Sequence, residues 1–410
     1  MIGRDPDEPV RSATPLELLY DLTFVIAFGA AASEFAHYLA EGHLWSGLGG
    51  FVFTVFAVSW AWINYSWFAS AFDNDDWLFR LATFVQMIGV IILTLGIPRV
   101  FESLDNGEQL DNGTLVAGYV VMRVALVGLW IRVAVTNPER RRAAISYAVI
   151  VGVAQLGWIA TAIADIDPLV MLVFAVLLFL LEFAGPVIGE LYKGGTPWHP
   201  GHIAERYGLL VIITLGEVIL GTVTTISAIV VEHGWTAEAI MLAFSGTALA
   251  FGIWWVYFAL PGRIAFRRAR WRTFVWAYGS IVVFAAIAAI GAGLHVAALA
   301  IEGESTLTSF QVILTIAVPL LVLWIAIFVL YSIVIRTFDP FHVPAFAASV
   351  LAMLAACAAV ALGASVAVGV TIMVLSPTVI IVAFETVAYR HEQQAIERLL
   401  AKEGHPPSES

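Results

Sequence analysis

The chain alternates long apolar runs with short polar breaks from one end to the other. Each run is about as long as a membrane helix requires, since a hydrocarbon core ~30 Å thick takes roughly 20 apolar residues. Twelve segments meet this requirement, and they run over 16–39, 45–68, 77–98, 113–136, 143–164, 168–190, 204–231, 237–260, 272–298, 309–335, 343–363 and 367–389. The pattern predicts an all-α, polytopic membrane bundle of about twelve transmembrane helices.

Composition agrees with this prediction. Of the 410 residues, 60% are hydrophobic and 12% are charged, whereas roughly a quarter of the residues of a soluble domain are charged. The net charge of -11 comes from acidic residues that lie mostly in the breaks and at the segment ends. We therefore expect the lipid bilayer as a partner and no nucleic acid.

The two ends of the chain and its single cysteine add little chemistry. Residues 1–15 contain no apolar stretch, so we expect no removable signal peptide and assign insertion to the first helix. Cys357 lies in an apolar run and has no second cysteine to pair with.

The basic residues predict the orientation, because short cytoplasmic loops accumulate Lys and Arg. With twelve spans, Arg99 alone of the 20 basic residues falls in a break on the far side, while Arg123 and Arg132 lie inside the fourth span. All the others fall on one side. We therefore expect a multi-pass protein of the cell inner (plasma) membrane with both termini in the cytoplasm.

The two halves of the sequence resemble each other weakly. The matching positions are Glu17 with Glu205, Trp62 with Trp254, Tyr65 with Tyr257, and Glu182 with Glu385. An even number of helices in each half makes the copies parallel. We therefore predict a cytoplasmic segment over 1–15, six-helix halves over 16–192 and 193–390, and a cytoplasmic tail over 391–410.

Glu17 and Asp21 place two carboxylates on one face of the first helix, four residues apart. Like charges at such a place require a counter-ion, a shared proton or a bound cation. Arg80 and Arg132 are the expected counter-charges. A buried salt-bridge network and a cation or proton site both remain open.

Glu217 lies deep in the seventh span, in TLGEVILGTV, near or just past the middle of the bilayer. An ionisable residue at that depth is costly and marks a functional site by default. Arg123 sits at a comparable depth and is the expected partner, with Glu205 and Arg206 at the start of the same span in a supporting role. A structural ion pair and a substrate or proton pathway are the two alternatives.

Two loops that correspond between the halves carry opposite charges. The acidic loop holds Asp73, Asp75 and Asp76 before Arg80, and the basic loop holds Arg267, Arg268 and Arg270. Attraction between them predicts a cytoplasmic gate that locks the halves together. Alternatively, the acids cap the third helix and the arginines only satisfy the topology rule.

No sequence motif of known chemistry occurs. His199 and His202 precede the seventh span, and we expect a polar helix cap there rather than a metal site. No Walker loop, dinucleotide fingerprint, nucleophile elbow or zincin motif is found. We therefore expect no enzyme activity, no metal and no cofactor.

Four stretches resemble the bacterial low temperature requirement protein A (LtrA) family of multi-pass membrane proteins. They are PLELLYDLTFV, WINYSWFASAFDNDDWLFR, YVVMR with Arg123, and HIAERYGLLVIITLGEVIL. The resemblance implies a membrane protein whose family name records a growth requirement in the cold, and it assigns no role to the motif residues. A fainter similarity, around Asp21, is to potassium channels with six-helix repeats, but the two residues before Asp21 depart from that signature.

The leading functional hypothesis is a secondary transporter, with proton coupling as an option, whose site for a small solute or ion includes Glu217, Arg123, Glu17 and Asp21. A cation channel, or a non-catalytic membrane protein involved in cold adaptation, is the alternative. A channel would tolerate neutralisation of Glu217 as long as Asp21 is kept.

Overall fold

The computed structural model describes residues 1–388 except positions 2, 7, 10, 165, 167, 260–269 and 336–341. This part of the chain contains helices and no strands. The helices are α1 (Pro15–Ala40), α2 (Leu44–Phe72), α3 (Trp77–Leu95), α4 (Ile97–Asp105), α5 (Gly113–Thr136), α6 (Arg141–Ile163), α7 (Pro168–Tyr192), α8 (Pro200–His233), α9 (Ala237–Ala259), α11 (Arg270–Ile301), α12 (Ser309–Ile335), α13 (His342–Ala361), α14 (Val366–Met373), α15 (Leu375–Ala383) and the π-helix η1 (Phe384–Ala388).

Within the described residues, twelve spans are long and apolar enough to cross a membrane, as the hydrophobic pattern predicts. The predicted boundaries agree with the helices within a few residues, and 113–136 and 309–335 coincide with α5 and α12, but the third span, predicted to end at 98, continues as α4 to Asp105. The polytopic helical fold is therefore confirmed.

Two spans are broken where proline removes a backbone donor. In the third span, α3 ends at Leu95 and α4 begins after Gly96, and Pro98 stands in the first turn of α4. In the twelfth span, α14 ends at Met373, four residues before Pro377. Proline cannot bond to the carbonyl four residues earlier and its ring crowds that carbonyl, so each helix yields at this place.

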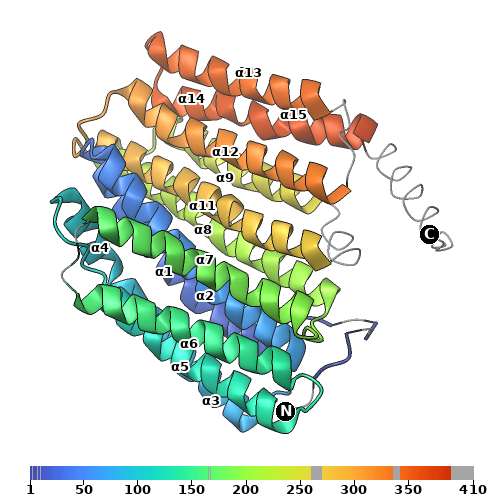
Figure 1. Cartoon of the computed structure of the whole chain (residues 1–410). Coiled ribbons are helices and arrows are strands. Elements are labelled where there is room, and N and C mark those ends of the chain that lie inside the picture. The colour runs from blue at the N-terminus through green and yellow to red at the C-terminus, as the bar shows by residue number, and fades with distance from the viewer. Residues whose placement is uncertain are drawn as a thin grey trace.

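The helices lie side by side in one bundle (Figure 1), with α3, α5 and α6 at one edge and α13 to α15 at the other. Between the edges, α11 packs against α1, α2, α8 and α12. The span of α11 is the most buried of the twelve: 83% of the residues in its most apolar stretch are buried inside the protein. The first and second parts of the chain therefore meet along α1, α2, α8 and α11.

Neighbouring helices follow a similar order in both parts of the chain. In the first part α1 packs on α2 and α3, and α5 packs on α3 and α6; in the second part α8 packs on α9 and α11, and α12 packs on α11 and α13. A duplication would produce this order, and the duplication itself stays a prediction.

We call the end of the bundle that holds the starts of α1 and α8 its N-terminal end. The chain before α1 packs onto this end: the Met1 ammonium donates to Thr136 Oγ1 at 2.5 Å, and the Arg4 amide donates to the Ala71 carbonyl at 2.9 Å. Arg11 is 5% exposed and donates to the Ala69 carbonyl at 2.8 Å. The predicted N-terminal segment therefore packs over the helix ends at this end of the bundle. The predicted tail over 391–410 lies outside the described residues.

Candidate functional site

A buried ion pair joins α1 to α8 about two turns from the N-terminal end. Arg206 Nη2 lies 2.7 Å from Asp21 Oδ1, and the same nitrogen donates to Ser66 Oγ at 3.1 Å. Trp62 Nε1 also donates to Asp21 Oδ1, at 2.7 Å. Arg206 is fully buried and Asp21 is 2% exposed, so three helices of the two parts of the chain converge on one carboxylate.

Glu17 lies one turn before Asp21 and binds the start of α8. Its Oε2 accepts hydrogen bonds from the Thr14 amide at 2.7 Å and, on the same oxygen, meets His202 Nε2 at 3.2 Å. The first contact closes a capping box at the start of α1, because Thr14 Oγ1 accepts in turn from the Glu17 amide. His199 caps α8 by accepting from the His202 amide, which confirms the predicted polar cap.

The predicted counter-charges of Glu17 and Asp21 are therefore wrong. Arg80 pairs with Asp75 at 2.7 Å, and Arg132 pairs with Asp76 at 2.7 Å, all within the first part of the chain. Arg80 follows the acidic loop by five residues, whereas Arg132 reaches it from α5, 56 residues after Asp76.

The acidic loop closes on its own helix. Asp76 accepts from the amides of Leu78 and Phe79, so it caps α3 as one alternative predicted. Of the proposed gate, Arg267 and Arg268 lie outside the described residues, as does the side chain of Arg270. The attraction between the two loops stays a prediction.

Asp73 and Asp76 respond to pH in opposite ways, and both lie between spans. Burial raises the pKa of Asp73 to about 6, whereas the hydrogen bonds from Arg132 lower the pKa of Asp76 to about 2. Because its pKa is raised in the folded protein, Asp73 favours the folded state fully at pH values below the ordinary pKa of an aspartate, where the carboxyl is protonated. This contribution to stability is lost as the pH rises through about 6.

We expect Asp73→Asn to remove the part of the pH dependence of stability that Asp73 contributes. Between pH 7 and pH 5 the wild type should gain about 1 kcal/mol relative to the variant. Thermal unfolding of both proteins in detergent, at several pH values, measures this difference. Parallel pH profiles would contradict it. Asp76 is ionised across this range, so it contributes equally at both pH values.

Arg123 does not pair with Glu217, which corrects the expected partner. It pairs with Glu182 of α7, with Arg123 Nη2 at 2.6 Å from Glu182 Oε2. Both side chains are 3% exposed, and Arg123 Nη2 also donates to Tyr119 Oη at 2.9 Å. Residues on α5 and α7 approach each other because α6 packs against both helices. The spacing of the helices along the sequence does not predict this contact.

Glu182 accepts further hydrogen bonds from two indoles. Trp60 Nε1 donates to Oε2, and Trp158 Nε1 donates to Oε1 at 3.2 Å. Four helices thus contribute to one buried cluster around an Arg–Glu pair. Neutral donors and a guanidinium together compensate the carboxylate, which a charge at this depth requires.

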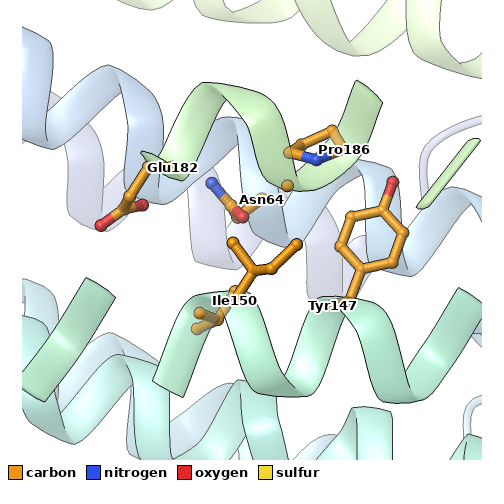
Figure 2. A pocket seen from close by; sticks show the side chains of 7 residues that line it. Asn64, Tyr147, Ile150, Glu182 and Pro186 are labelled. Atoms are coloured by element: carbon orange, nitrogen blue, oxygen red, sulfur yellow. The ribbon is translucent and has the colours of Figure 1, made fainter. Parts of the chain in front are cut away.

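A narrow cavity opens beside Glu182 (Figure 2). Its first part, of about 10 Å³, is lined by Asn64, Tyr147, Ile150, Val151, Glu182, Gly185 and Pro186. Its second part, of about 20 Å³, shares Asn64, Tyr147 and Pro186 and extends to Thr196, in the loop at the N-terminal end. Glu182 and Tyr147 stand at opposite ends of the view in Figure 2, with Asn64 between them. The two parts are neighbours through these shared residues, and they lie between Thr196 and Glu182.

Glu217 occupies the middle of the 34-residue α8 and is 6% exposed. It forms no hydrogen bond and no ion pair with the residues that the structure describes. Glycines allow the neighbouring helices to close around it: a Cβ at Gly29 of α1 would come 3.2 Å from Glu217 Oε1, and one at Gly291 of α11 would come 2.5 Å from its backbone oxygen. An acidic side chain without a partner thus sits where α1, α8 and α11 meet.

The supporting residues play smaller parts. Glu205 Oε1 accepts from the Ala13 amide at 3.4 Å, and Glu385 Oε1 accepts from Trp255 Nε1 at 3.1 Å at an exposed position. Sequence reasoning underrated Glu182 and His202 and overlooked Glu190, which accepts from Tyr147 Oη at 3.1 Å. The signal for Glu182 was its place four residues before Pro186 in an otherwise apolar span.

Comparison with known proteins yields a family and one distant relative. An uncharacterized protein of Rhizobium meliloti (strain 1021), RA0937, is 25% identical over 252 residues, which is 59% of this chain and 57% of that protein. The match thus spans little more than half the length of that relative. No solved structure matches the chain. The model of the bacterial low temperature requirement A protein (LtrA) matches residues 12–377, so this multi-pass membrane chain belongs to the LtrA family.

Proposed function

We propose that the protein is a proton-coupled secondary transporter of a small solute, with Glu217 as the group that takes up and releases the proton. The observation that carries the proposal is the isolation of this carboxyl at mid-helix. An ionised carboxylate without a partner in lipid costs several kcal/mol. A side chain so placed must bind a proton or a cation, and it can exchange that proton when a neighbouring helix moves.

Three other buried acids serve a different purpose. Asp21, Glu17 and Glu182 each have a basic partner at 2.6 to 3.2 Å. They hold helices together in the state described here. The meeting of α1, α8 and α11 at Glu217 supports coupling, because α1 belongs to the first part of the chain and α8 and α11 belong to the second, and a rocking motion would shift the two parts against one another.

The cavity beside Glu182 supports a path for the solute. It begins near Thr196 at the N-terminal end, which we propose faces the cytoplasm, and it ends at a charged pair near the middle of the bundle. The proposal is for transport rather than catalysis, with binding, protonation and helix movement as its steps.

Replacing Glu217 by glutamine tests the proposal. Proteoliposomes that hold a pH-sensitive dye are exposed to a panel of amino acids, amines, sugars and inorganic ions. We expect at least one solute to change the luminal pH with the wild type, and we expect Glu217→Gln to reduce this response to that of empty liposomes. The thermal stability of the variant should stay within about 1 kcal/mol of the wild type, because no ion pair is lost.

Glu34→Gln is the matched control, since Glu34 is a half-buried carboxyl of α1 nearer the far end of the bundle. It should leave the response unchanged. A proton flux that persists in Glu217→Gln would contradict the role of this residue. Passive ion currents that persist in that variant, without any solute-driven proton movement, would indicate a channel instead.

A further inference from the structure

We infer that the cavity beside Glu182 binds a small ammonium group, that of the ammonium ion or of a short primary amine. The inference deepens the proposed transport function and rests on it for the assignment of this ligand as the transported solute. Four features of the cavity carry it: free acceptors, aromatic walls, the sign of the lining charge, and size.

One acceptor arises from the proline inside α7, a helix that continues unbroken to Tyr192. Pro186 has no backbone N–H, so the carbonyl of Glu182, four residues earlier, lacks the hydrogen bond that a helix normally supplies. Glu182, Gly185 and Pro186 together form this wall of the cavity. Across from it, Asn64 Nδ2 donates to the Trp60 carbonyl at 2.7 Å, which leaves Asn64 Oδ1 as an acceptor beside the cavity (Figure 2).

Aromatic rings form most of the remaining wall. The lining includes five of them: Trp67, Trp130, Tyr147, Phe274 and Tyr278. The hydroxyl of Tyr147 donates to Glu190 Oε1 at 3.1 Å, and that of Tyr278 donates to the Phe183 carbonyl at 3.2 Å. Trp130 and Tyr147 stack on each other with ring centroids 4.3 Å apart, so one face of each of these two rings is covered. The electron-rich faces of such rings attract a cation, and an ammonium group is the kind of ligand they recognise.

The charge of the lining has one sign. Glu182 is the charged residue of the cavity walls, and no Lys, Arg or His lines either described part. Glu182 Oε2 is taken by Arg123 and Trp60, but Oε1 accepts a single bond of 3.2 Å, from Trp158. That oxygen retains the capacity to accept from a second donor. An anion would meet these acceptors without a Lys, Arg or His of the lining to neutralise it, because Arg123 already pairs with Glu182.

Size narrows the class of cation. The two parts measure about 10 and 20 Å³, and one water-sized occupant needs roughly 10 to 15 Å³ by this measure. The described state therefore has room for the ammonium ion or for a primary amine with one small substituent. A quaternary ammonium group cannot enter without further opening, and it also lacks the N–H donors that match the acceptors.

Thermal unfolding of the full-length protein in detergent tests the inference without any transport. Methylammonium chloride, sodium chloride and tetramethylammonium chloride are compared at equal ionic strength. We expect methylammonium to raise the midpoint temperature in a saturable manner, because a ligand that binds the native state stabilises it, and we expect the other two salts to have no such effect. Equal effects of all three salts would overturn the inference.

Two substitutions at Asn64 make opposite predictions. Asn64→Leu removes an acceptor of a charged donor and should raise the apparent Kd by about tenfold or more. Asn64→Asp adds a carboxylate and should lower it, so a folding defect in one variant does not remove the test. Asn106→Leu, at an exposed position of the far end, is the control and should bind like the wild type. Unchanged affinity in both Asn64 variants would refute the assigned site.

The outcomes separate this inference from the proposed function. Saturable methylammonium binding together with an absence of any solute-driven proton flux would uphold the site and reject the transporter. Proton flux driven by another solute, with no methylammonium binding, would uphold the transporter and reject this substrate class.

Discussion

Arg123→Leu is expected to destabilise the protein by about 3 to 5 kcal/mol, because it leaves the carboxylate of Glu182 buried without its counter-charge. Glu182 would keep its hydrogen bonds from Trp60 and Trp158, but two neutral donors do not replace a guanidinium 2.6 Å away. Thermal or denaturant-induced unfolding in detergent measures the loss. A destabilisation below about 1 kcal/mol would show that the pair is not a structural element.

The double variant Arg123→Leu with Glu182→Gln is the decisive control. It removes both charges at once, while the glutamine carbonyl can still accept a hydrogen bond from one of the two indoles. Replacing a buried pair by neutral groups is often close to neutral, so most of the lost stability should return. Comparing these variants with Glu217→Gln separates the paired buried acids from the unpaired one. Neutralising Glu217 leaves no buried counter-charge without its partner.

Gly118→Val is expected to cost at least about 3 kcal/mol or to prevent folding, because α3 and α5 touch backbone to backbone at this residue. A Cβ on Gly118 would lie 2.3 Å from the Leu93 amide nitrogen and 2.5 Å from the Gly89 carbonyl oxygen. Backbone atoms of a neighbouring helix cannot rotate away as a side chain can. The two helices would have to separate, and Arg123, one turn further along α5, would shift with them.

Gly128→Val on the same helix is the matched control. A Cβ there meets nothing within 4 Å, so the same change in side chain and in helix propensity should alter stability by no more than about 0.5 kcal/mol. Expression yield, gel-filtration profile and unfolding midpoint in detergent measure both variants. Equal behaviour of the two variants would contradict the close packing of α3 on α5.

Small residues at helix contacts explain much of how this bundle is assembled. Lipid offers no hydrophobic driving force between helices, so close approach through glycine matters more than in a soluble core. Gly89 with Gly118 joins α3 to α5, and Gly221 with Gly291 joins α8 to α11 beside Glu217. Thr225 adds an interhelical hydrogen bond of 2.7 Å to the Leu294 carbonyl at the second contact.

The number, length and limits of the membrane helices were predictable from the sequence alone. Apolar length is a local property: a run of about 20 apolar residues must span a bilayer as a helix, since its backbone has no other partner in lipid. Local signals also predicted the caps at Asp76 and His199, because a cap bonds to amides within three residues of itself. The two breaks near Pro98 and Pro377 were not predicted, since proline alone does not decide a break: Pro186 and Pro319 lie inside the continuous helices α7 and α12.

The partners of the buried charges were decided only by the tertiary structure. Depth along a helix predicted that Arg123 and Glu217 could meet, but depth does not say which faces of which helices turn toward each other. Because α6 packs against both α5 and α7, Arg123 pairs with Glu182, while Glu217 lies next to glycines of α1 and α11. Pairing between helices depends on rotation and neighbour order, which arise from the summed contacts of the whole bundle.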